Sequence, residues 1–340
     1  MDRTVDWADG AIVAIDQTAL PGEYRLVRLT DVDALIAAIQ ALVVRGAPAL
    51  GAAGALGVAL AALRVGDSGL RPELGSAGEA EVRVAAERIA RARPTAVNLA
   101  WGVGQALEFL GEGSEAVLGR ALAILDEDER DNRAAGRRAA DHILGLCERR
   151  PLRLHTHCNA GRLATVAWGT ALGAVHELVG RGVVGEVLAD ETRPLLQGAR
   201  LTAWELAEMG VPYRICVDSA GPAAIAAGMV DCVIVGADRI AANGDVANKI
   251  GTFSLALAAQ YAGIPFVVVA PESTVDLGTA TGREIVVEQR DAGEVTHVMG
   301  RRIAPAGAGV FNPAFDVTPA ELVTAVVTQG RVMAGGRGVG

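Results

Sequence analysis

The chain has 340 residues, which is long enough for two domains and a substantial core. Hydrophobic residues make up 51% of the sequence but aromatic residues only 4%, so the core must be built from aliphatic side chains. The net charge of −9 argues against a nucleic-acid partner, because phosphate backbones bind basic surfaces. It does not exclude a small anionic substrate, which a local cluster of Arg and Lys can bind.

Cysteine usage and the first residues indicate a cytoplasmic protein. The four cysteines show no CxxC spacing, and the opening sequence, MDRTVDWADG, contains no apolar stretch typical of a signal peptide. We therefore expect reduced thiols. The uncharged stretch 46–63 consists mostly of Ala and Gly and would gain little on entering lipid, so it predicts a tightly packed buried helix and no membrane contact.

The first 150 residues predict a mostly helical domain that begins with a small β-hairpin. Two short strand-like runs, residues 11–15 and 24–29, form the expected hairpin. A helix that Thr30 or Asp31 caps should follow, up to about Val44. Helical patterns then continue to the end of this half.

From Pro151 on, short apolar runs alternate with helical patterns, which is typical of βαβ units and a parallel sheet. The expected strands are residues 152–156, 183–189, 213–217, 232–235 and 266–269. The fold class is therefore α/β, with a helical N-terminal domain (1–150) and a Rossmann-like domain (151–340) that carries most of the catalytic residues. The glycine-rich end from Arg331 on is expected to fray.

The stretch GADRIAANGDVANKIGT, residues 236–252, directly follows one of these strands. Ligands bind at the carboxyl ends of the strands in open parallel sheets, so Asp238 is a candidate site residue. Asn248 is a candidate N-cap of a helix expected over 250–262, and Lys249 beside the free N–H groups of that helix would suit a phosphate. Each residue taken alone is also explained by an ordinary turn or cap.

Two earlier loops each place an arginine before an expected helix. RGAPA, residues 45–49, leaves Arg45 at a helix N-terminus, where guanidinium donors and free backbone N–H groups form a sound anion site. RPTAVNL, residues 93–99, interrupts a helical pattern at Arg93, and Thr95 is expected to cap the helix that follows. The alternative in both loops is an ordinary turn with a solvated arginine.

HTHCNAG, residues 155–161, ends the first strand of the parallel sheet and is expected to open a helix. His155, His157 and Cys158 are possible metal ligands, but no second cluster at ligand spacing accompanies them, so we expect no metal. A helix N-terminus lowers the pKa of a thiol, which makes Cys158 a candidate reactive thiolate. A buried, inert cysteine is the ordinary alternative.

Segments spread over most of the chain resemble, in order, the signature segments of the methylthioribose-1-phosphate isomerases: RGAPA, RPTAVNL, THCNAG, ETRP…Q, GADRI…NGD…NKIGT and NPAFDVTP. The wider family includes the regulatory subunits of translation initiation factor 2B. The resemblance implies conversion of S-methyl-5-thioribose 1-phosphate to the corresponding ribulose 1-phosphate in methionine salvage, without a cofactor. It also implies that the protein forms a homodimer and binds this small sugar phosphate as its substrate.

The same resemblance implies roles for individual residues. Cys158 is the catalytic cysteine, either as a base at C2 or as a group that stabilises a hydride shift. Asp238 is the candidate acid that opens the sugar ring, with a pKa raised by burial. Arg193 helps to shape the pocket, and Asp218 lies behind the site. The expected substrate-binding residues are Arg45, Gly46, Ala47, Arg93, Gln197, Asn248 and Lys249.

Three alternatives stay open. A ribose-1,5-bisphosphate isomerase of the same family would need a further cationic pocket, which the sequence does not place. A 5-deoxyribose 1-phosphate would fit the same apolar pocket and would be an additional substrate. The rival from a different class is a non-catalytic regulatory subunit of a translation factor; Cys158, Asp238 and the set of Arg45, Arg93 and Lys249 speak against it.

Overall fold

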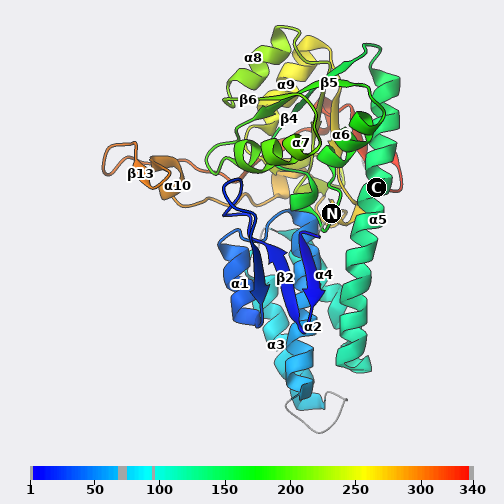
Figure 1. Ribbon diagram of the computed structural model, residues 1–340, viewed down its shortest axis with the longest axis vertical. Helices are drawn as coiled ribbons and strands as arrows, with labels where there is room; N and C mark the ends of the chain where they lie inside the picture. The colour runs from blue at the N-terminus through cyan, green and yellow to red at the C-terminus, as the bar shows by residue number, and fades with distance from the viewer. Residues whose placement is uncertain (1–2, 68–74, 94–95, 337–340) are drawn as a thin grey trace.

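The computed structural model describes residues 3–67, 75–93 and 96–336. A helical half with a small antiparallel sheet lies below a mostly parallel seven-stranded sheet, which confirms the predicted fold class (Figure 1). The 33-residue helix α5 (Ser114–Leu146) runs along the side of both halves. A domain boundary near residue 150 would fall just after this helix and stays a prediction.

The small antiparallel sheet contains the predicted hairpin and one further strand. Its strands are β1 (Val5–Ala8), β2 (Ala11–Ile15) and β3 (Leu26–Leu29). Helix α1 (Val32–Gln40) follows, and its N-cap is Asp31, whose carboxylate accepts a hydrogen bond of 2.7 Å from the Ala34 N–H. The helix ends earlier than the predicted Val44, because the chain leaves the helical region at Leu42, whose φ is 61°.

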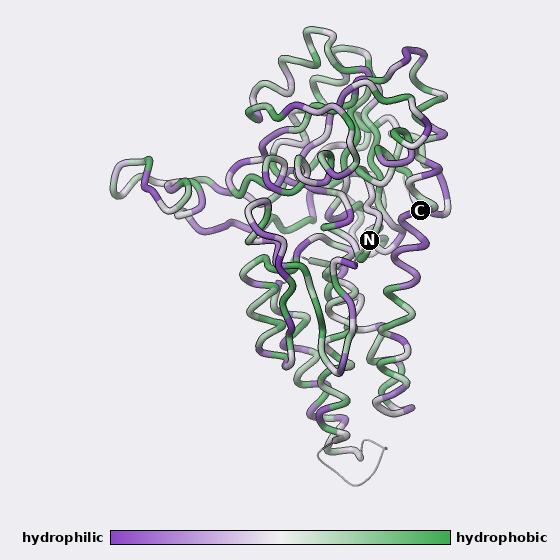
Figure 2. The backbone as a smooth tube through the Cα atoms, viewed as in Figure 1, coloured by the Kyte–Doolittle hydropathy of each residue, from purple (hydrophilic) through white to green (hydrophobic). Residues whose placement is uncertain are grey.

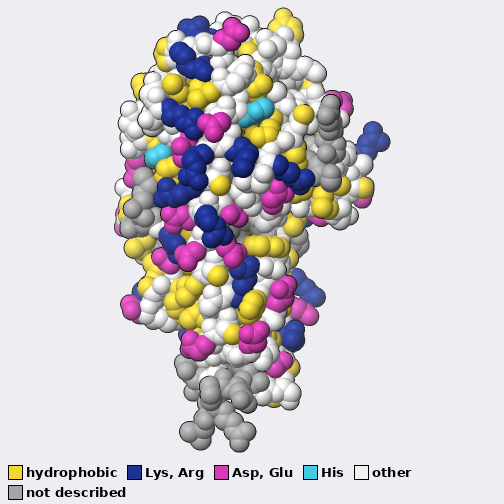
Figure 3. Space-filling view, turned by 90° about the vertical axis from the view of Figure 1, so that its right-hand side faces the viewer, with side chains coloured by type: hydrophobic (Ala, Val, Ile, Leu, Met, Phe, Trp, Pro, Cys, Tyr) yellow, Lys and Arg dark blue, Asp and Glu magenta, His cyan; other side chains and the backbone are white. Residues whose placement is uncertain are grey.

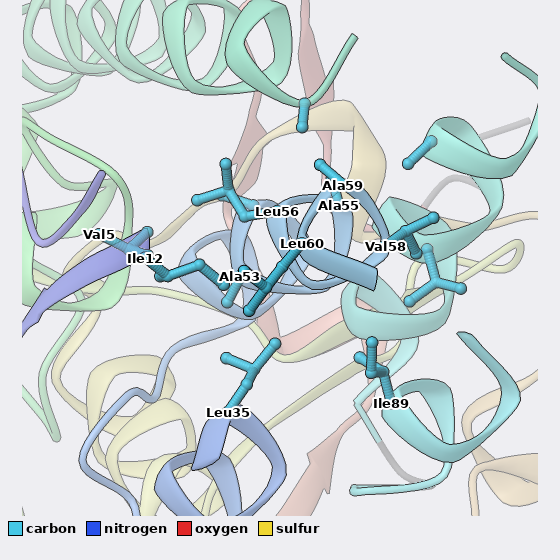
Figure 4. Close-up of a cluster of buried hydrophobic side chains, with 14 of the residues drawn as sticks. Val5, Ile12, Leu35, Ala53, Ala55, Leu56, Val58, Ala59, Leu60 and Ile89 are labelled. Carbon is cyan, nitrogen blue, oxygen red and sulfur yellow. The ribbon is translucent and has the colours of Figure 1, made fainter. Parts of the chain in front are cut away.

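Helix α2 (Ala47–Asp67) occupies the centre of the first core, surrounded by Leu35 of α1 and Ile89 of α3 (Figure 4). By length and composition alone it could cross a membrane, but 78% of its apolar window is buried inside the protein. The helices around it are α3 (Ser76–Ala90), α4 (Val97–Leu107) and α5. Glycines allow the closest approach: a Cβ on Gly102 would lie 1.9 Å from the Gly51 carbonyl oxygen. The Ala/Gly-rich stretch therefore forms the tightly packed buried helix that the sequence predicted.

The seven-stranded sheet has the order β16-β15-β10-β7-β4-β5-β6 and is parallel except for β16. All five predicted strands are present, and two more extend the sheet near the C-terminus, so the expected fraying from Arg331 on is wrong for residues 332–334. The strands are β4 (Leu152–Thr156), β5 (Val184–Asp190), β6 (Tyr213–Cys216), β7 (Cys232–Val235), β10 (Phe266–Val269), β15 (Ala325–Val327) and β16 (Val332–Ala334).

Helices cover both faces of this sheet. In β7, Cys232 and Ile234 join the hydrophobic cluster on one face, and Val233 and Val235 join the cluster on the other, as the two-residue period of a strand requires. The first cluster is closed by α5, α6 (Ala171–Gly180) and α7 (Ala203–Glu208), the second by α8 (Ala220–Ala226) and α9 (Thr252–Ala262). Hydrophobic segments accordingly gather in the central strands, while the outer loops are more hydrophilic (Figure 2).

A second, four-stranded sheet, in the order β11-β8-β9-β14, lies beside the carboxyl ends of the large sheet and corrects one prediction. Asn248 is not a helix N-cap: it belongs to β9, where it pairs with Asp316 of β14. Helix α9 begins only at Thr252, after Gly251 with φ 111°. The strands are β8 (Arg239–Ala241), β9 (Val246–Lys249), β11 (Val275–Asp276) and β14 (Phe315–Thr318).

Two peripheral features complete the fold. A hairpin of β12 (His297–Val298) and β13 (Arg301–Arg302), preceded by α10 (Gly293–Thr296), projects from the body (Figure 1). Basic and acidic side chains are interspersed on the side along which α5 runs (Figure 3). One acidic residue of α5, Asp128, points inward instead and accepts a hydrogen bond of 2.7 Å from the Val166 N–H. Its burial raises the pKa of this carboxyl to about 7.

Candidate active site

One cavity lies between the two halves of the chain, where β4 and β7 end. The α1–α2 turn and Arg93 contribute its wall from the N-terminal half, and the loops after β4 and β7 contribute the opposite wall. Every residue predicted to bind substrate or to act in catalysis lines it: Arg45, Gly46, Ala47, Arg93, Cys158, Gln197, Asp238, Asn248 and Lys249. Segments far apart in the sequence thus converge on one concave surface, although their roles remain predictions.

Arg45 ties the N-terminal half to the loop after β4. Its Nη1 donates to Oδ1 of Asn159 (2.6 Å) and its Nη2 to the Asn159 carbonyl oxygen (2.9 Å). The neighbouring Gly46 has φ +93°, and a Cβ there would lie 2.3 Å from the backbone of Ala164. No other residue fits this contact, which brings the start of α2 against the loop that carries Cys158.

Arg93 forms an ion pair with Glu288, which in turn pairs with Arg290; the sequence analysis did not predict either contact. Its Nη2 lies 3.5 Å from Oε2 of Glu288, and Arg290 donates to the other oxygen of Glu288 (2.8 Å). Arg290 also lines the cavity. No motif marks this segment, so sequence reasoning had no signal for it. The predicted cap Thr95 lies outside the described residues.

Lys249 and Asn248 reach the cavity from β9 rather than from a helix start. Nδ2 of Asn248 donates to Oγ1 of Thr252 (2.9 Å), and Nζ of Lys249 lies 5.7 Å from the centre of the Phe315 ring. Burial lowers the pKa of Lys249; the charges of Cys158 and Asp238 offset part of this. The ammonium group is therefore poorly solvated, which strengthens its attraction for an incoming anion.

Cys158 follows β4 in a left-handed turn (φ 59°), and its N–H donates to Oγ1 of Thr192 (2.9 Å). The predicted helix start at this cysteine is wrong. A short 3₁₀ turn, Arg162–Ala164, follows, and α6 begins only at Ala171. Burial raises the pKa of the Cys158 thiol, and the nearby Arg45 and Lys249 offset this only in part. This direction is opposite to the lowered pKa that a helix N-terminus would give.

Asp238 lies between β7 and β8, and its backbone N–H donates to the Ala247 carbonyl oxygen (2.9 Å). Burial raises the pKa of its carboxyl, while the charges of Lys249, Arg93 and Arg45 lower it without cancelling the effect. The direction is the one predicted for an acid that must hold a proton. This main-chain bond, and not the carboxylate, joins the start of β8 to β9.

The layer behind Cys158 agrees with one expectation and corrects another. Asp218 accepts hydrogen bonds of 2.7 Å from the N–H groups of Thr192 and Arg193, so it supports the residue that holds Cys158. The Arg193 side chain turns away and donates to the carbonyl of Val295 (3.1 Å); it does not line the cavity. Gln197 does line it, and its buried Oε1 has no hydrogen-bond partner among the described residues. A ligand hydroxyl would satisfy this oxygen.

The possible metal ligands that lie close together in the structure are not the three residues, His155, His157 and Cys158, considered from the sequence. Among the described residues, the one such group is His157, Asp190 and Asp218, whose ligand atoms lie within 4.8 Å of one another. Cys158 is not a member. Both ring nitrogens of His157 already have partners within 2.8 Å, which makes the group a hydrogen-bonded cluster rather than an open coordination site.

Comparison with known proteins shows the family to which this chain belongs. A sequence profile described as the Initiation factor 2 subunit family matches residues 43–334. The chain belongs to this family. Within it, the chain is 51% identical to a methylthioribose-1-phosphate isomerase from Anaeromyxobacter sp., covering 95% of this chain and 91% of that relative. It is 50% identical to a 5-deoxyribose 1-phosphate isomerase from Moorella thermoacetica, covering 96% and 92%.

A third relative in the family is longer. The Nocardia farcinica protein named as a probable bifunctional methylthioribose-1-phosphate isomerase/methylthioribulose-1-phosphate dehydratase is 58% identical over 98% of this chain, which spans only 59% of that protein. Among solved structures, a 5-methylthioribose 1-phosphate isomerase from Pyrococcus horikoshii matches with a TM-score of 0.87 at 38% identity, covering 99% of this chain and 94% of that chain. A protein titled translation initiation factor eIF-2B, subunit delta, from A. fulgidus matches with 0.83 at 42%, covering 98% and 96%.

Proposed function

We propose that this chain is a methylthioribose-1-phosphate isomerase, which converts the aldose phosphate to the ribulose 1-phosphate in methionine salvage. The observation that carries the proposal is the cavity in which a half-buried acid, Asp238, and a half-buried thiol, Cys158, meet the cationic side chains of Arg45, Arg93 and Lys249. Relatives of that name at about 50% identity over nearly the whole chain support it. A homodimer in the cytoplasm belongs to the same proposal.

The chemistry follows from the substrate. Phosphate on the anomeric oxygen blocks ordinary ring opening to a free aldehyde, so another way of breaking the ring is needed. The carboxylic acid of Asp238 donates a proton to the ring oxygen, and the C1–O4 bond breaks with its electrons going to that oxygen. The C2 hydrogen then moves to C1, and the C2 hydroxyl returns a proton to the Asp238 carboxylate, which gives the ketone and regenerates the acid.

The cationic residues bind the phosphate. Arg45 precedes α2 and Arg93 precedes α4, and both line the cavity, where their guanidinium groups can donate to a phosphate. Lys249 approaches from β9 on the other wall. Fixing the phosphate at this end places C1 and C2 between Cys158 and Asp238.

The alternatives differ in how well the cavity suits them. The relative from Moorella thermoacetica supports a 5-deoxyribose 1-phosphate as an additional substrate. A bisphosphate would need a second cationic site, and the extra arginine at the cavity, Arg290, is already paired with Glu288 and Glu294. A non-catalytic regulatory subunit has no need for an acid and a thiol that line the same cavity as three cationic side chains.

The test is an assay of the purified protein with three substrates in parallel: methylthioribose 1-phosphate, 5-deoxyribose 1-phosphate and ribose 1,5-bisphosphate. Ketose formation is followed for each. We expect turnover of the first, weaker or equal turnover of the second, and none of the third. Turnover of the bisphosphate alone, or of none of them by a folded protein, would refute the proposal.

A further inference from the structure

His157 lies directly before Cys158 and is fully buried, and both of its ring nitrogens face acceptors. Nδ1 lies 2.7 Å from Oδ2 of Asp190, and Nε2 lies 2.8 Å from the Ile250 carbonyl oxygen. A carbonyl oxygen can only accept, so Nε2 must carry a hydrogen. An ionised carboxylate also only accepts, so Nδ1 must carry one too. With Asp190 ionised, this geometry therefore calls for a doubly protonated ring, an imidazolium.

The groups packed around this ring support its charge. Asp190 also faces His155, whose Nε2 lies 3.2 Å from Oδ1, and it accepts from the thiol of Cys216 (3.3 Å). Burial would raise the pKa of Asp190, but its bonds to the two histidines lower it to about 2, so it is ionised. Two further carboxyls, Asp218 after β6 and Asp316 of β14, lie near enough to interact with the ring.

The effects of the surroundings on the pKa of His157 also favour the charged ring. Burial lowers the pKa of His157, because a buried charge is poorly solvated. The hydrogen bond and the charge of Asp190, with the bond to Ile250, outweigh the burial and raise the pKa above its ordinary value. The ring and Asp190 form a buried ion pair with a further acceptor on the far side.

This pair joins three parts of the site. Asp190 ends β5, His157 precedes Cys158, and Ile250 directly follows β9, the strand that carries Asn248 and Lys249. The fit is close, since a Cβ on Gly251 would lie 2.8 Å from Cε1 of His157. A change in the ring would shift the thiol relative to β9.

We propose that His157 is a positioning residue, held as an imidazolium between Asp190 and the Ile250 carbonyl, that fixes the Cys158 thiol relative to the strand carrying Asn248 and Lys249. It does not touch the reacting atoms in this role. The inference about catalysis rests on the proposed isomerase function, whereas the charge state of the ring does not depend on it.

The charge state is tested first, by ¹⁵N NMR of the histidine side chains in the wild-type protein without substrate. The chain has five histidines, and the His157 signals are assigned by comparison with the variants below. We expect both ring nitrogens of His157 to be protonated at pH 7.5. A neutral ring at that pH would overturn the proposal whatever the protein turns over.

Two variants then test the bridge. In His157→Gln, the amide cannot donate to Asp190 and to Ile250 at once, so the link breaks; misplacement of a reacting group by about 1 Å costs up to roughly 10²-fold. We expect kcat to fall by about 10- to 100-fold. In Asp190→Asn, the amide donates to Nδ1 and the neutral ring still donates to Ile250, so the link persists and kcat should fall much less, with a neutral ring in the NMR spectrum.

His142→Gln is the matched control, because His142 lies on α5 away from the cavity; its kcat should equal that of the wild type. A His157→Gln protein within twofold of wild-type kcat would overturn the positioning role, as would an Asp190→Asn protein that loses as much as His157→Gln. If His157→Gln does not fold, the NMR result on the wild type and the Asp190→Asn kinetics still decide the question.

Discussion

The substitution Asp238→Asn separates an acid from a structural residue. The Asp238 N–H donates to the Ala247 carbonyl oxygen and joins the start of β8 to β9, and asparagine keeps that bond. The amide also keeps the shape of the carboxyl group but has no acidic proton to transfer. Folding and ligand binding should therefore be little changed, while the ring-opening step loses its acid.

The size of the loss follows from what a general acid contributes. A positioned acid or base is worth roughly 10²–10⁴-fold in rate, which corresponds to about 3–5 kcal/mol of transition-state stabilisation. Burial raises the pKa of Asp238, so the wild-type kcat/KM should fall as pH increases through that raised value, because the protonated form is the active one. This alkaline limb should be absent in Asp238→Asn.

The assay is ketose formation from methylthioribose 1-phosphate across pH, with product binding measured separately. Asp245→Asn is the matched control on the β8–β9 turn: its carboxylate accepts from the N–H groups of Gly282 and Ala320 outside the cavity, so stability should fall while kcat holds. An Asp238→Asn enzyme that keeps near-wild-type kcat, with the same alkaline limb, would show that Asp238 is not the acid.

Three further substitutions or probes test other parts of the site. Arg93→Ala should weaken phosphate binding by roughly 1.5–3 kcal/mol, whereas Arg91→Ala, an exposed neighbour, should leave KM unchanged. Alkylation of Cys158 should be blocked by product and still accelerate at pH 9, because the pKa of its thiol is raised; equal labelling of buried Cys147 would contradict this. Gly46→Ala should lower the free energy of unfolding by more than about 1–2 kcal/mol, because of the left-handed φ of Gly46 alone. The same change at exposed Gly104, where a Cβ meets nothing within 4 Å, should raise the free energy of unfolding by about 0.5–1 kcal/mol. Chemical denaturation measures both values.

The sequence predicted five of the seven strands of the large sheet because they are short apolar runs between helical patterns. The run at 232–235 is buried on both faces and can be recognised without knowing its neighbours. The ends of such strands marked Cys158 and Asp238 as candidates, and the resemblance to the methylthioribose-1-phosphate isomerases assigned their roles. The arginine loops were found because glycine and proline mark the breaks between helices.

The errors share one cause, which is pairing between segments distant in sequence. The local sequence around Asn248 is typical of a helix cap. In the structure, Asn248 is a strand residue because it pairs with β14, more than sixty residues later. The role of His157 depends on Asp190 and Ile250. Arg290 enters the cavity through its pairing with Glu288, which in turn faces Arg93. A single sequence carries no local signal for any of these contacts.

The raised pKa values of both reacting groups also bear on the route of the C2 hydrogen. A proton-transfer route needs Cys158 ionised while Asp238 is protonated, yet burial opposes the charged form of the thiol at the same time as it favours the neutral acid. Burial therefore disfavours the thiolate that this route needs. A direct shift of hydride from C2 to C1 needs only the protonated acid, and a buried neutral thiol is compatible with it. The electrostatics of the cavity thus favour the hydride shift, and product formed in D₂O should carry no solvent deuterium at C1.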